Sequence, residues 1–301
     1  MRLDVVVRLL DAYFRVPEVE NDAAWGEMYD TFLEAPYWRE HADPGWERRW
    51  NGLMVRGADD VEGAVTCVFP SDEIVAGLEP RTLLFSEHPI ALGDGDLFTP
   101  LAEQSFAAMH DRSVAFYHVH APLDHHPEIS PSRLIANGLG IEELEEYFPI
   151  ADGIPGGAAV IGASRLGLDE LAARLSELLG DEIPVAVMTR PRERAGRVAV
   201  AGGGGAQRDI LEASLERGCE TYVTGNAASP CPIPEVQEGI RAFRELSEEE
   251  GVAVVDGTHY GTEKLPQLAM VEWFRAVGLP AEFAPGRPER GPWSKEPSLD
   301  G

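Results

Sequence analysis

Short apolar runs alternate with amphipathic stretches along most of this chain. The apolar runs, rich in valine, alanine and phenylalanine, predict buried strands, whereas stretches with apolar residues three and four positions apart predict helices. We expect strands at 61–70, 82–85, 113–120, 158–162, 184–188, 197–201, 221–224 and 253–256. We expect helices at 2–16, 22–39, 71–78, 101–110, 130–139, 168–179, 208–216, 234–250 and 264–277, and a polar, turn-rich segment at 42–57. This order predicts two α/β domains, in which mostly parallel or mixed sheets are flanked by helices.

The composition adds a strong negative charge. The 52 aspartates and glutamates outnumber the 25 lysines and arginines, which gives a net charge of −27. Such a surface repels nucleic acid phosphates and anionic membranes, so we expect neither as a partner. Only two of the basic residues, Lys264 and Lys295, are lysines. An acid-rich, lysine-poor surface suits a protein kept dissolved at high salt, where screening removes self-repulsion, and it predicts a halophilic source.

The cysteines and the N-terminus bear on the compartment. Cys67, Cys219 and Cys231 are odd in number and far apart, which disfavours a disulfide framework or a thiolate zinc site and indicates reduced, structural thiols. No apolar run reaches the roughly 18 residues that span a bilayer. The N-terminal stretch has arginine and aspartate inside its apolar pattern, unlike the apolar core of a signal peptide. We therefore expect a cytoplasmic protein.

Histidines and carboxylates gather just after two of the predicted strands. Glu87 and His88 follow the first of these, where a carboxylate is costly unless it is paired or solvated. His118 and His120 would share one face of the second, with Asp124 in the loop beyond it. An aspartate can bridge two cations through its two oxygens. From the residues alone, His88 is better explained as a core histidine that donates to a carbonyl, and the loop could be a salt-adapted surface.

Another such pair follows a later apolar run. If a helix begins near Tyr260, then His259 and Glu263 lie one turn apart on the same face, where they can share a metal ion. The alternative is a histidine that caps the helix, with a glutamate in its first turn. His125 and His126 are also compatible with a simple polar loop.

The glycine run Gly202–Gly205 follows a predicted strand and precedes a predicted helix. Its backbone N–H groups could cradle an anion, or the run could form only a tight turn. It lacks the Lys–Ser/Thr ending of a P-loop and the GxGxxG spacing. Both interpretations stay open at this point.

Taken in order, these segments resemble the Nif3-like (Ngg-interacting-factor-three-like) family of dinuclear metal-centre proteins, also known as GTP cyclohydrolase 1 type 2 homologues. The likeness extends from the Asn51–Gly57 segment to the helix after Glu263. The matching segments are Glu87-His88-Pro89 for a His-His-Pro, His120-Ala121-Pro122-Leu123-Asp124 for a His-x-x-Leu-Asp, Gly202–Gly205 for a glycine turn, Thr224-Gly225-Asn226 for a Thr-Gly-Glu, and His259, Tyr260 and Glu263, after Thr258, for a Gly-His-Tyr-x-x-Glu.

The resemblance implies a site for two divalent metal ions, between the two domains. Its ligands would be Glu87, His88, Asp124, His259 and Glu263. Asp124 would bridge the ions, Glu263 could share that role, and His120 would be the catalytic residue that moves a proton. Two positions depart from the family, because Glu87 replaces a histidine and Asn226 replaces a glutamate. The extra carboxylate hardens the site and favours manganese, magnesium or iron relative to zinc.

The resemblance also implies how the chain is organised. Because the implied ligands come from both ends of the chain, we expect residues 1–130 and 250–280 to form the metal-site domain. Residues 131–249 would form a second α/β domain, and residues 281–301 a loose tail. The family assembles as a toroidal hexamer, so we expect a homo-oligomer.

Two functions from different classes follow. The first is a metal-dependent hydrolase that acts on a small anionic substrate such as a nucleotide or phosphoester, with GTP ring opening as one specific version. The second is a non-enzymatic protein that handles metal ions or serves as a scaffold. A plain α/β protein with structural histidines would require these motifs to occur in family order by accident.

Overall fold

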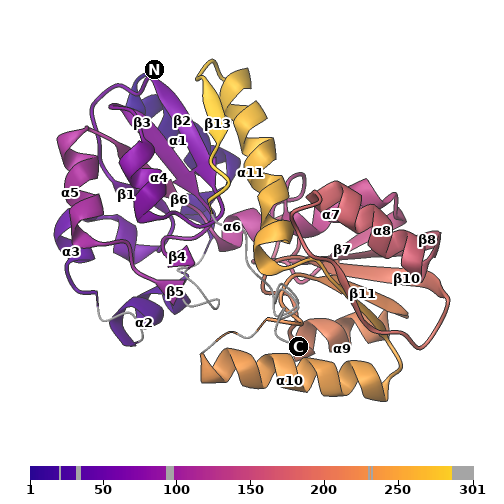
Figure 1. Cartoon of the computed structure of the whole chain (residues 1–301). Coiled ribbons are helices and arrows are strands. Elements are labelled where there is room, and N and C mark those ends of the chain that lie inside the picture. The colour runs from indigo at the N-terminus through magenta and orange to yellow at the C-terminus, as the bar shows by residue number, and fades with distance from the viewer. Residues whose placement is uncertain (20–21, 32–34, 93–97, 230, 232, 287–301) are drawn as a thin grey trace, which may run out of the picture. The chain divides into compact units, whose positions relative to one another are not determined.

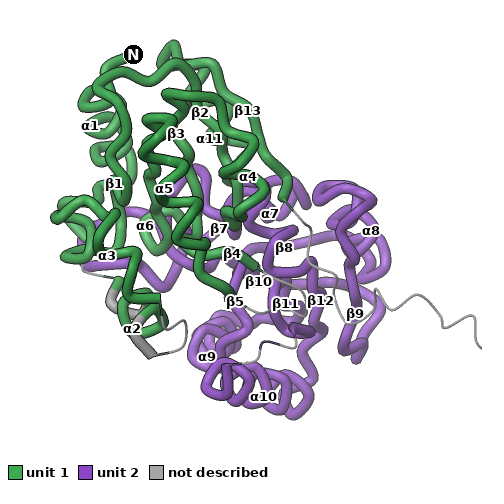
Figure 2. Tube along the Cα trace, turned by 60° about the vertical axis from the view of Figure 1, so that its left-hand side comes forward, with its two compact units in different colours: residues 1–93, 98–123, 266–287 green, residues 94–97, 124–265, 288–301 purple. Residues whose placement is uncertain are grey.

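The computed structural model of the chain describes residues 1–19, 22–31, 35–92, 98–229, 231 and 233–286. These residues form two compact units (Figure 2). The first unit contains the described residues of 1–93, 98–123 and 266–287, and the second contains those of 124–265. Each unit has its own sheet flanked by helices, as the alternating pattern predicts.

The first unit is built on a five-stranded mixed sheet (Figure 1). Its strand order is β1-β6-β3-β2-β13, and each neighbouring pair is parallel except β1 with β6. The strands are β1 (Gly52–Val55), β2 (Gly63–Cys67), β3 (Thr82–Ser86), β6 (Ala115–His118) and β13 (Ala281–Phe283). The helices are α1 (Leu3–Tyr13), η1 (Val16–Glu18), α2 (Ala23–Thr31), α3 (Trp38–His41), η2 (Trp46–Arg48), α4 (Asp72–Gly77) and α5 (Glu103–Asp111). The central strands β3 and β6 are buried along their whole length, which explains their nearly continuous apolar sequences.

The second unit is built on a six-stranded mixed sheet in the order β7-β8-β10-β11-β12-β9. The pairs β10–β11 and β11–β12 are parallel, and the other three are antiparallel. The strands are β7 (Glu142–Tyr147), β8 (Ala159–Gly167), β9 (Ala186–Thr189), β10 (Arg194–Ala201), β11 (Thr221–Thr224) and β12 (Ala253–Asp256). The helices are α7 (Pro131–Leu139), α8 (Leu168–Leu179), α9 (Arg208–Glu216) and α10 (Pro234–Glu249). The three parallel strands end beside the segments that carry Gly202, Asn226 and His259.

Two helices carry residues of both units. α6 (Ala121–Asp124) ends at the first residue of the second unit, and α11 (His259–Ala276) begins in the second unit and continues in the first. A short antiparallel pair, β4 (Ala91–Leu92) with β5 (Phe98–Thr99), completes the described strands. Among the described helices, none is both long enough and apolar enough to cross a membrane.

Tryptophans dominate the core of the first unit near its N-terminal segment. Trp25, Trp38, Trp46 and Trp50 are each at most 6% exposed. The Trp46 and Trp50 ring centroids lie 4.8 Å apart at 69°, and those of Trp38 and Trp46 lie 5.4 Å apart at 80°. Edge-to-face pairs of this kind add to the stability gained from apolar burial. This aromatic cluster supports the histidines at the end of β6.

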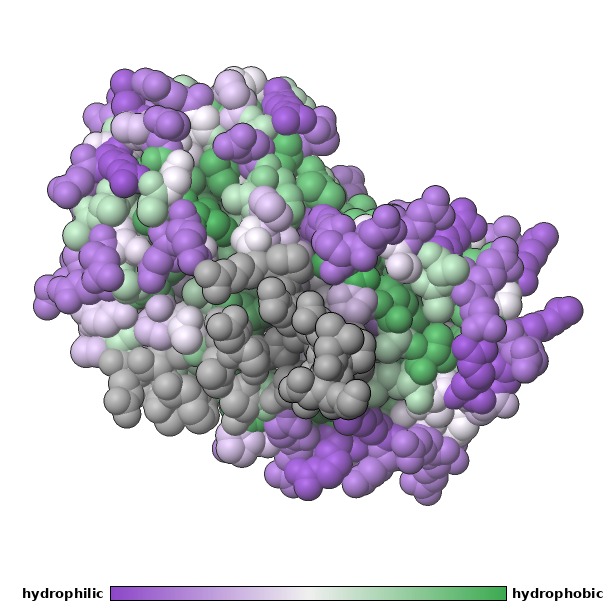
Figure 3. Space-filling model, viewed as in Figure 1, coloured by the Kyte–Doolittle hydropathy of each residue, from purple (hydrophilic) through white to green (hydrophobic). Residues whose placement is uncertain are grey.

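Hydrophilic residues are exposed on the second unit. Figure 3 shows hydrophilic residues gathered along α10, where Glu235, Glu238 and Glu248 are exposed. The three cysteines, by contrast, are buried.

Most elements lie where the apolar pattern predicts them. α8, α9, β11 and β12 begin and end at the predicted residues. Ser71 caps α4 as its sequence indicates, because its Oγ accepts a hydrogen bond from the Ile74 amide. The division into domains at 1–130 with 250–280 and at 131–249, and the position of a metal site between them, stay predictions.

Several elements differ from the prediction. β1 lies in the segment expected to be turn-rich and starts at Gly52, whose φ is 102°. α6 occupies an expected loop, and β13 lies in the expected tail, where it pairs with β2. The helix expected at 22–39 is two helices, α2 and α3, with residues 32–34 outside the described part. Residues 287–301 of the tail are also outside it.

The apolar pattern did not predict β7, for a physical reason. Its sequence, EELEEY, is too acidic to resemble a strand, but β7 is an edge strand whose glutamates meet arginines. Glu142 pairs with Arg165, and Glu145 accepts a hydrogen bond from Arg217. Charges on an edge strand also disfavour pairing with another chain.

Candidate metal centre

α11 begins with two of the predicted ligands. Thr258 caps this helix, because its Oγ1 accepts a hydrogen bond from the Gly261 amide at 2.9 Å. Its φ of 64° is one that glycine adopts more readily. The His259 Nε2 and Glu263 Oε1 atoms lie 2.8 Å apart. The helix therefore starts earlier than the predicted residue 264 and places both side chains on one face.

Farther along α11, Gln267 contacts Glu87, which follows β3 together with His88. Glu87 and His88 are 0% and 1% exposed, and the Phe69 ring stacks on that of His88 with centroids 4.1 Å apart. Gln267 Nε2, one turn beyond Glu263, donates a hydrogen bond to Glu87 Oε2 at 3.1 Å. Residues four apart share a helix face, so Glu263 and Gln267 lie on the same face of α11.

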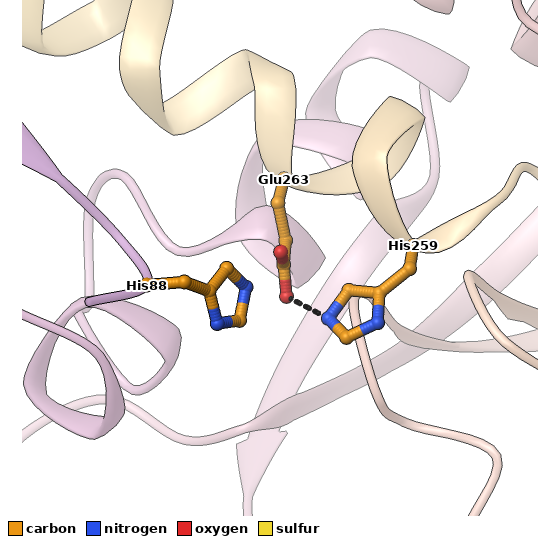
Figure 4. Close-up of side chains that lie close together, drawn as sticks. All are labelled: His88, His259 and Glu263. Carbon is orange, nitrogen blue, oxygen red and sulfur yellow. Dashed lines mark ion pairs between the residues drawn. The ribbon is translucent and has the colours of Figure 1, made fainter. Parts of the chain in front are cut away.

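The predicted ligands offer two groups of ligand atoms. His88, His259 and Glu263 each offer one atom, and these atoms all lie within 4.8 Å of one another (Figure 4). Glu87, Asp124 and Glu263 form a second group by the same measure. Glu263 belongs to both groups. The first combines imidazole and carboxylate donors, as zinc, iron and manganese sites do, and the second has carboxylates alone, which suit hard cations.

The glycine run packs directly against this glutamate. A Cβ added at Gly203 would lie 2.2 Å from Glu263 Oε1, and the Gly203 φ is 55°. The Gly203 amide donates a hydrogen bond to Thr262 Oγ1 at 2.8 Å. Glycine is therefore needed here both for the backbone conformation and for the close approach of the carboxylate.

Other amides in and just after the run also bond within the protein. The Gly205 amide donates to the Gly202 carbonyl, and the Ala206 amide donates to Asn226 Oδ1 at 2.8 Å. These contacts favour the tight-turn interpretation over the anion cradle. They also explain Asn226, which departs from the family glutamate and here closes the loop that supports Gly203.

His120, the predicted proton carrier, pairs with a residue that the sequence did not single out. Its Nδ1 lies 2.9 Å from Asp22 Oδ2, and its backbone amide donates to Asn51 Oδ1 at 2.8 Å. Burial opposes ionisation of Asp22, but the hydrogen bond from His120 and the electrostatic interaction with His120 outweigh it. The pKa of Asp22 therefore lies below its ordinary value. No spacing rule connects two residues 98 positions apart.

His118 is a neutral core histidine beside these groups. It is 0% exposed, and the rings of Trp46 and Trp25 lie 5.8 Å and 6.1 Å from its own. Burial, followed by the charge of His120, holds its pKa well below the ordinary value. His126 is structural too, because its Nδ1 accepts hydrogen bonds from two backbone amides of the following turn.

The sequence analysis also did not identify Gln267 and Trp25 as residues near the site. Gln267 stands four positions after Glu263, a spacing that could have identified it on the same helix face. Trp25 could not be identified from the sequence, because its ring contacts residues that are distant along the chain. Its centroid lies 4.9 Å from that of His120 and 5.4 Å from that of His88.

Known proteins are similar to this chain in sequence and in fold. The chain is 29% identical over 238 residues to a GTP cyclohydrolase 1 type 2 homolog of Deinococcus radiodurans, an alignment that covers 77% of this chain and 83% of the relative. It is 26% identical over 204 residues to the homolog of Nostoc sp., with 65% and 70% covered.

Two solved structures show the same fold at low identity. One, described as protein ybgI of unknown function, has a TM-score of 0.66 at 19% identity and covers 96% of this chain and 99% of its own. The other, reduced HcgD from Methanocaldococcus jannaschii, has a TM-score of 0.62 at 18% identity, with 94% and 97% covered. The family model of Duf34/NIF3 matches residues 37–278. The chain therefore belongs to the Duf34/NIF3 (NGG1p interacting factor 3) family.

Proposed function

We propose that the chain holds a pair of divalent cations and hydrolyses a small anionic substrate of the nucleotide or phosphoester type. The observation that carries this proposal is the sharing of Glu263 by two groups of ligand atoms. A carboxylate that belongs to two groups can bridge two cations through its two oxygens. Glu263 would thus be the main bridging ligand, a role that the motif assigns first to Asp124.

The donor set fits metal ions on physical grounds. Three carboxylates whose oxygens lie within 4.8 Å repel one another, and Glu263 and Glu87 are almost fully buried. A cation held among them would offset this repulsion. The carboxylate-rich group favours manganese, magnesium or iron, and the group with His88 and His259 accepts zinc as well.

Five residues would bind the metal ions and one would transfer protons. Glu87, His88, Asp124, His259 and Glu263 would hold the ions. A bound pair of divalent ions lowers the pKa of water and polarises a phosphoryl or carbonyl oxygen. His120 would accept a proton from the attacking water and return it to the leaving group.

The relatives suggest where to look for a substrate. Those of Deinococcus and Nostoc are called GTP cyclohydrolase 1 type 2 homologs, so GTP ring opening is the first activity to assay, followed by other nucleotides and phosphoesters. A homo-hexameric assembly is part of the same proposal and can be tested by light scattering.

The test combines metal content with turnover. Purified wild type is compared with Asp124→Ala and with the control Asp152→Ala, which changes an exposed turn aspartate. We expect about two ions per chain and a turned-over substrate in wild type and control, and loss of both in Asp124→Ala. Bound metal without turnover of any nucleotide or phosphoester would favour the metal-handling alternative. No metal in the wild type, even after incubation with manganese and zinc, would overturn the metal centre itself.

A further inference from the structure

We propose that Asp22 is a positioning residue for His120, holding it in the tautomer that carries the proton on Nδ1 and the lone pair on Nε2. The proton-transfer role of this tautomer rests on the proposed function, but the tautomer itself does not. The pair is short, with Nδ1 and Oδ2 2.9 Å apart, and the side chains of His120 and Asp22 are only 26% and 13% exposed. A carboxylate accepts hydrogen bonds and donates none, so the shared proton belongs to Nδ1.

One short segment fixes both partners. The Arg49 carbonyl accepts hydrogen bonds from the Asp22 amide at 3.0 Å and from Asn51 Nδ2 at 3.3 Å. Asn51 Oδ1 in turn accepts from the His120 amide at 2.8 Å. Asn51 is 4% exposed, so these bonds lie largely out of water. The Asp22 backbone is therefore held by Arg49 and the His120 backbone by Asn51, and the hydrogen bond between these two residues links the two attachments.

Trp25 restricts the imidazole from another side. It stands in the first turn of α2, three residues after Asp22, and its ring meets that of His120 at 84° with centroids 4.9 Å apart. Trp25 is 4% exposed, so it also keeps water from this side of the ring. The edge-to-face contact holds the plane of the ring, and a flip of the ring within that plane would break the hydrogen bond at Nδ1.

This arrangement comes from the chain's own N-terminal segment. The family match begins at residue 37, whereas Asp22 and Trp25 precede it. His120 stands within the matched region, in the His-x-x-Leu-Asp segment. The match with the family model therefore identifies His120 but not the two residues that hold it.

The tautomer can be read directly. The full chain, labelled with ¹⁵N-histidine and loaded with diamagnetic zinc, is studied by long-range ¹H–¹⁵N correlation at a pH where the His120 ring is neutral, with His120→Gln to assign its signals. We expect wild type to show a protonated Nδ1 and an unprotonated Nε2. Asp22→Ala should move the population toward the Nε2–H form, Asp22→Glu should restore much of the wild-type pattern, and the control Asp43→Asn should leave it unchanged.

The outcomes separate the two proposals. A wild-type ring that carries its proton on Nε2, or an Asp22→Ala spectrum identical to wild type, overturns the role of Asp22. If Asp22→Ala fails to fold, the wild-type and Asp22→Glu spectra still decide the tautomer. Where a turned-over substrate exists, kcat should fall in Asp22→Ala while KM stays within about twofold, because a positioning residue acts on the reacting step rather than on binding. Absence of any turnover would count against the hydrolase but leave the tautomer result standing.

Discussion

Glu263 is the residue on which the candidate site depends most. It pairs with His259, belongs to both groups of ligand atoms, and is 1% exposed. Its carboxylate has room only because residue 203 lacks a side chain. The glycine loop therefore acts on the site through sterics, as a support of the ligand rather than as an anion cradle.

This support predicts a specific loss. Gly203→Ala would place a methyl group 2.2 Å from Glu263 Oε1 in a backbone conformation that alanine disfavours. Displacing a ligand through its support should lower metal affinity about 10- to 100-fold. Gly204→Ala is the matched control, since nothing lies within 4 Å of its added Cβ. Metal titration by calorimetry distinguishes them, and equal affinities for the two variants would contradict the support role.

Asp256 carries a second residue-scale prediction. It is 1% exposed at the end of β12, and its oxygens accept hydrogen bonds from the Thr258 and Ala228 amides. Burial raises its pKa to about 6, partly opposed by those amides. Because the folded pKa lies above the unfolded value, its contribution to stability is complete below the unfolded pKa and is lost as pH rises through about 6.

The expected loss is about 2 kcal/mol between about pH 4 and about pH 7. Asp256→Asn cannot ionise, so the difference in unfolding free energy between wild type and variant should fall by that amount over the same interval. Urea unfolding at several pH values measures it. A difference that stays constant, or grows with pH, would show that the burial of Asp256 does not control its ionisation.

At the scale of the element, α11 decides how the site forms. The apolar pattern identified this helix but began it at residue 264, because GTHYGT contains two glycines and two threonines that disfavour a helix interior. The start at His259 depends on the Thr258 cap and on the Asp256 carboxylate that accepts the Thr258 amide. Such contacts are local in sequence but depend on the end of β12, so propensity alone misplaces the boundary.

α4 shows the opposite case, a boundary that the sequence specifies. Ser71 Oγ accepts the Ile74 amide at 3.1 Å, so Ser71→Ala should lower the free energy of unfolding by about 1 kcal/mol. Ser71→Gly should cost only a few tenths of a kcal/mol, and Ser71→Asp almost nothing. Urea denaturation of the four proteins tests this order. An alanine variant as stable as the aspartate variant would mean that the cap contributes nothing.

At the scale of the whole molecule, the sequence predicts the α/β class and most elements, because buried strands and amphipathic helices leave period-specific patterns. It predicts His259 and Glu263 together because one helix turn joins them. It does not predict the Asp22–His120 pair or the contact between Gly203 and Glu263, because these join residues 98 and 60 positions apart through tertiary packing. Motif order identified candidate ligands, and only the packed structure shows what supports them.

The net charge of −27 is a property of the whole chain and predicts a salt response. Self-repulsion of that size destabilises a compact state, and screening shortens the reach of each charge from about 10 Å at 0.1 M salt to about 3 Å at 1 M. The urea midpoint should therefore rise with potassium chloride, most steeply below about 0.5 M, and then level off as screening becomes complete. A rise that continues in proportion to salt would instead indicate general exclusion of the salt from the protein surface. An absent rise would mean that ion pairs such as Arg133–Glu146 and Arg192–Glu220 already balance the local charges, so that the acidic composition would not make the fold depend on salt.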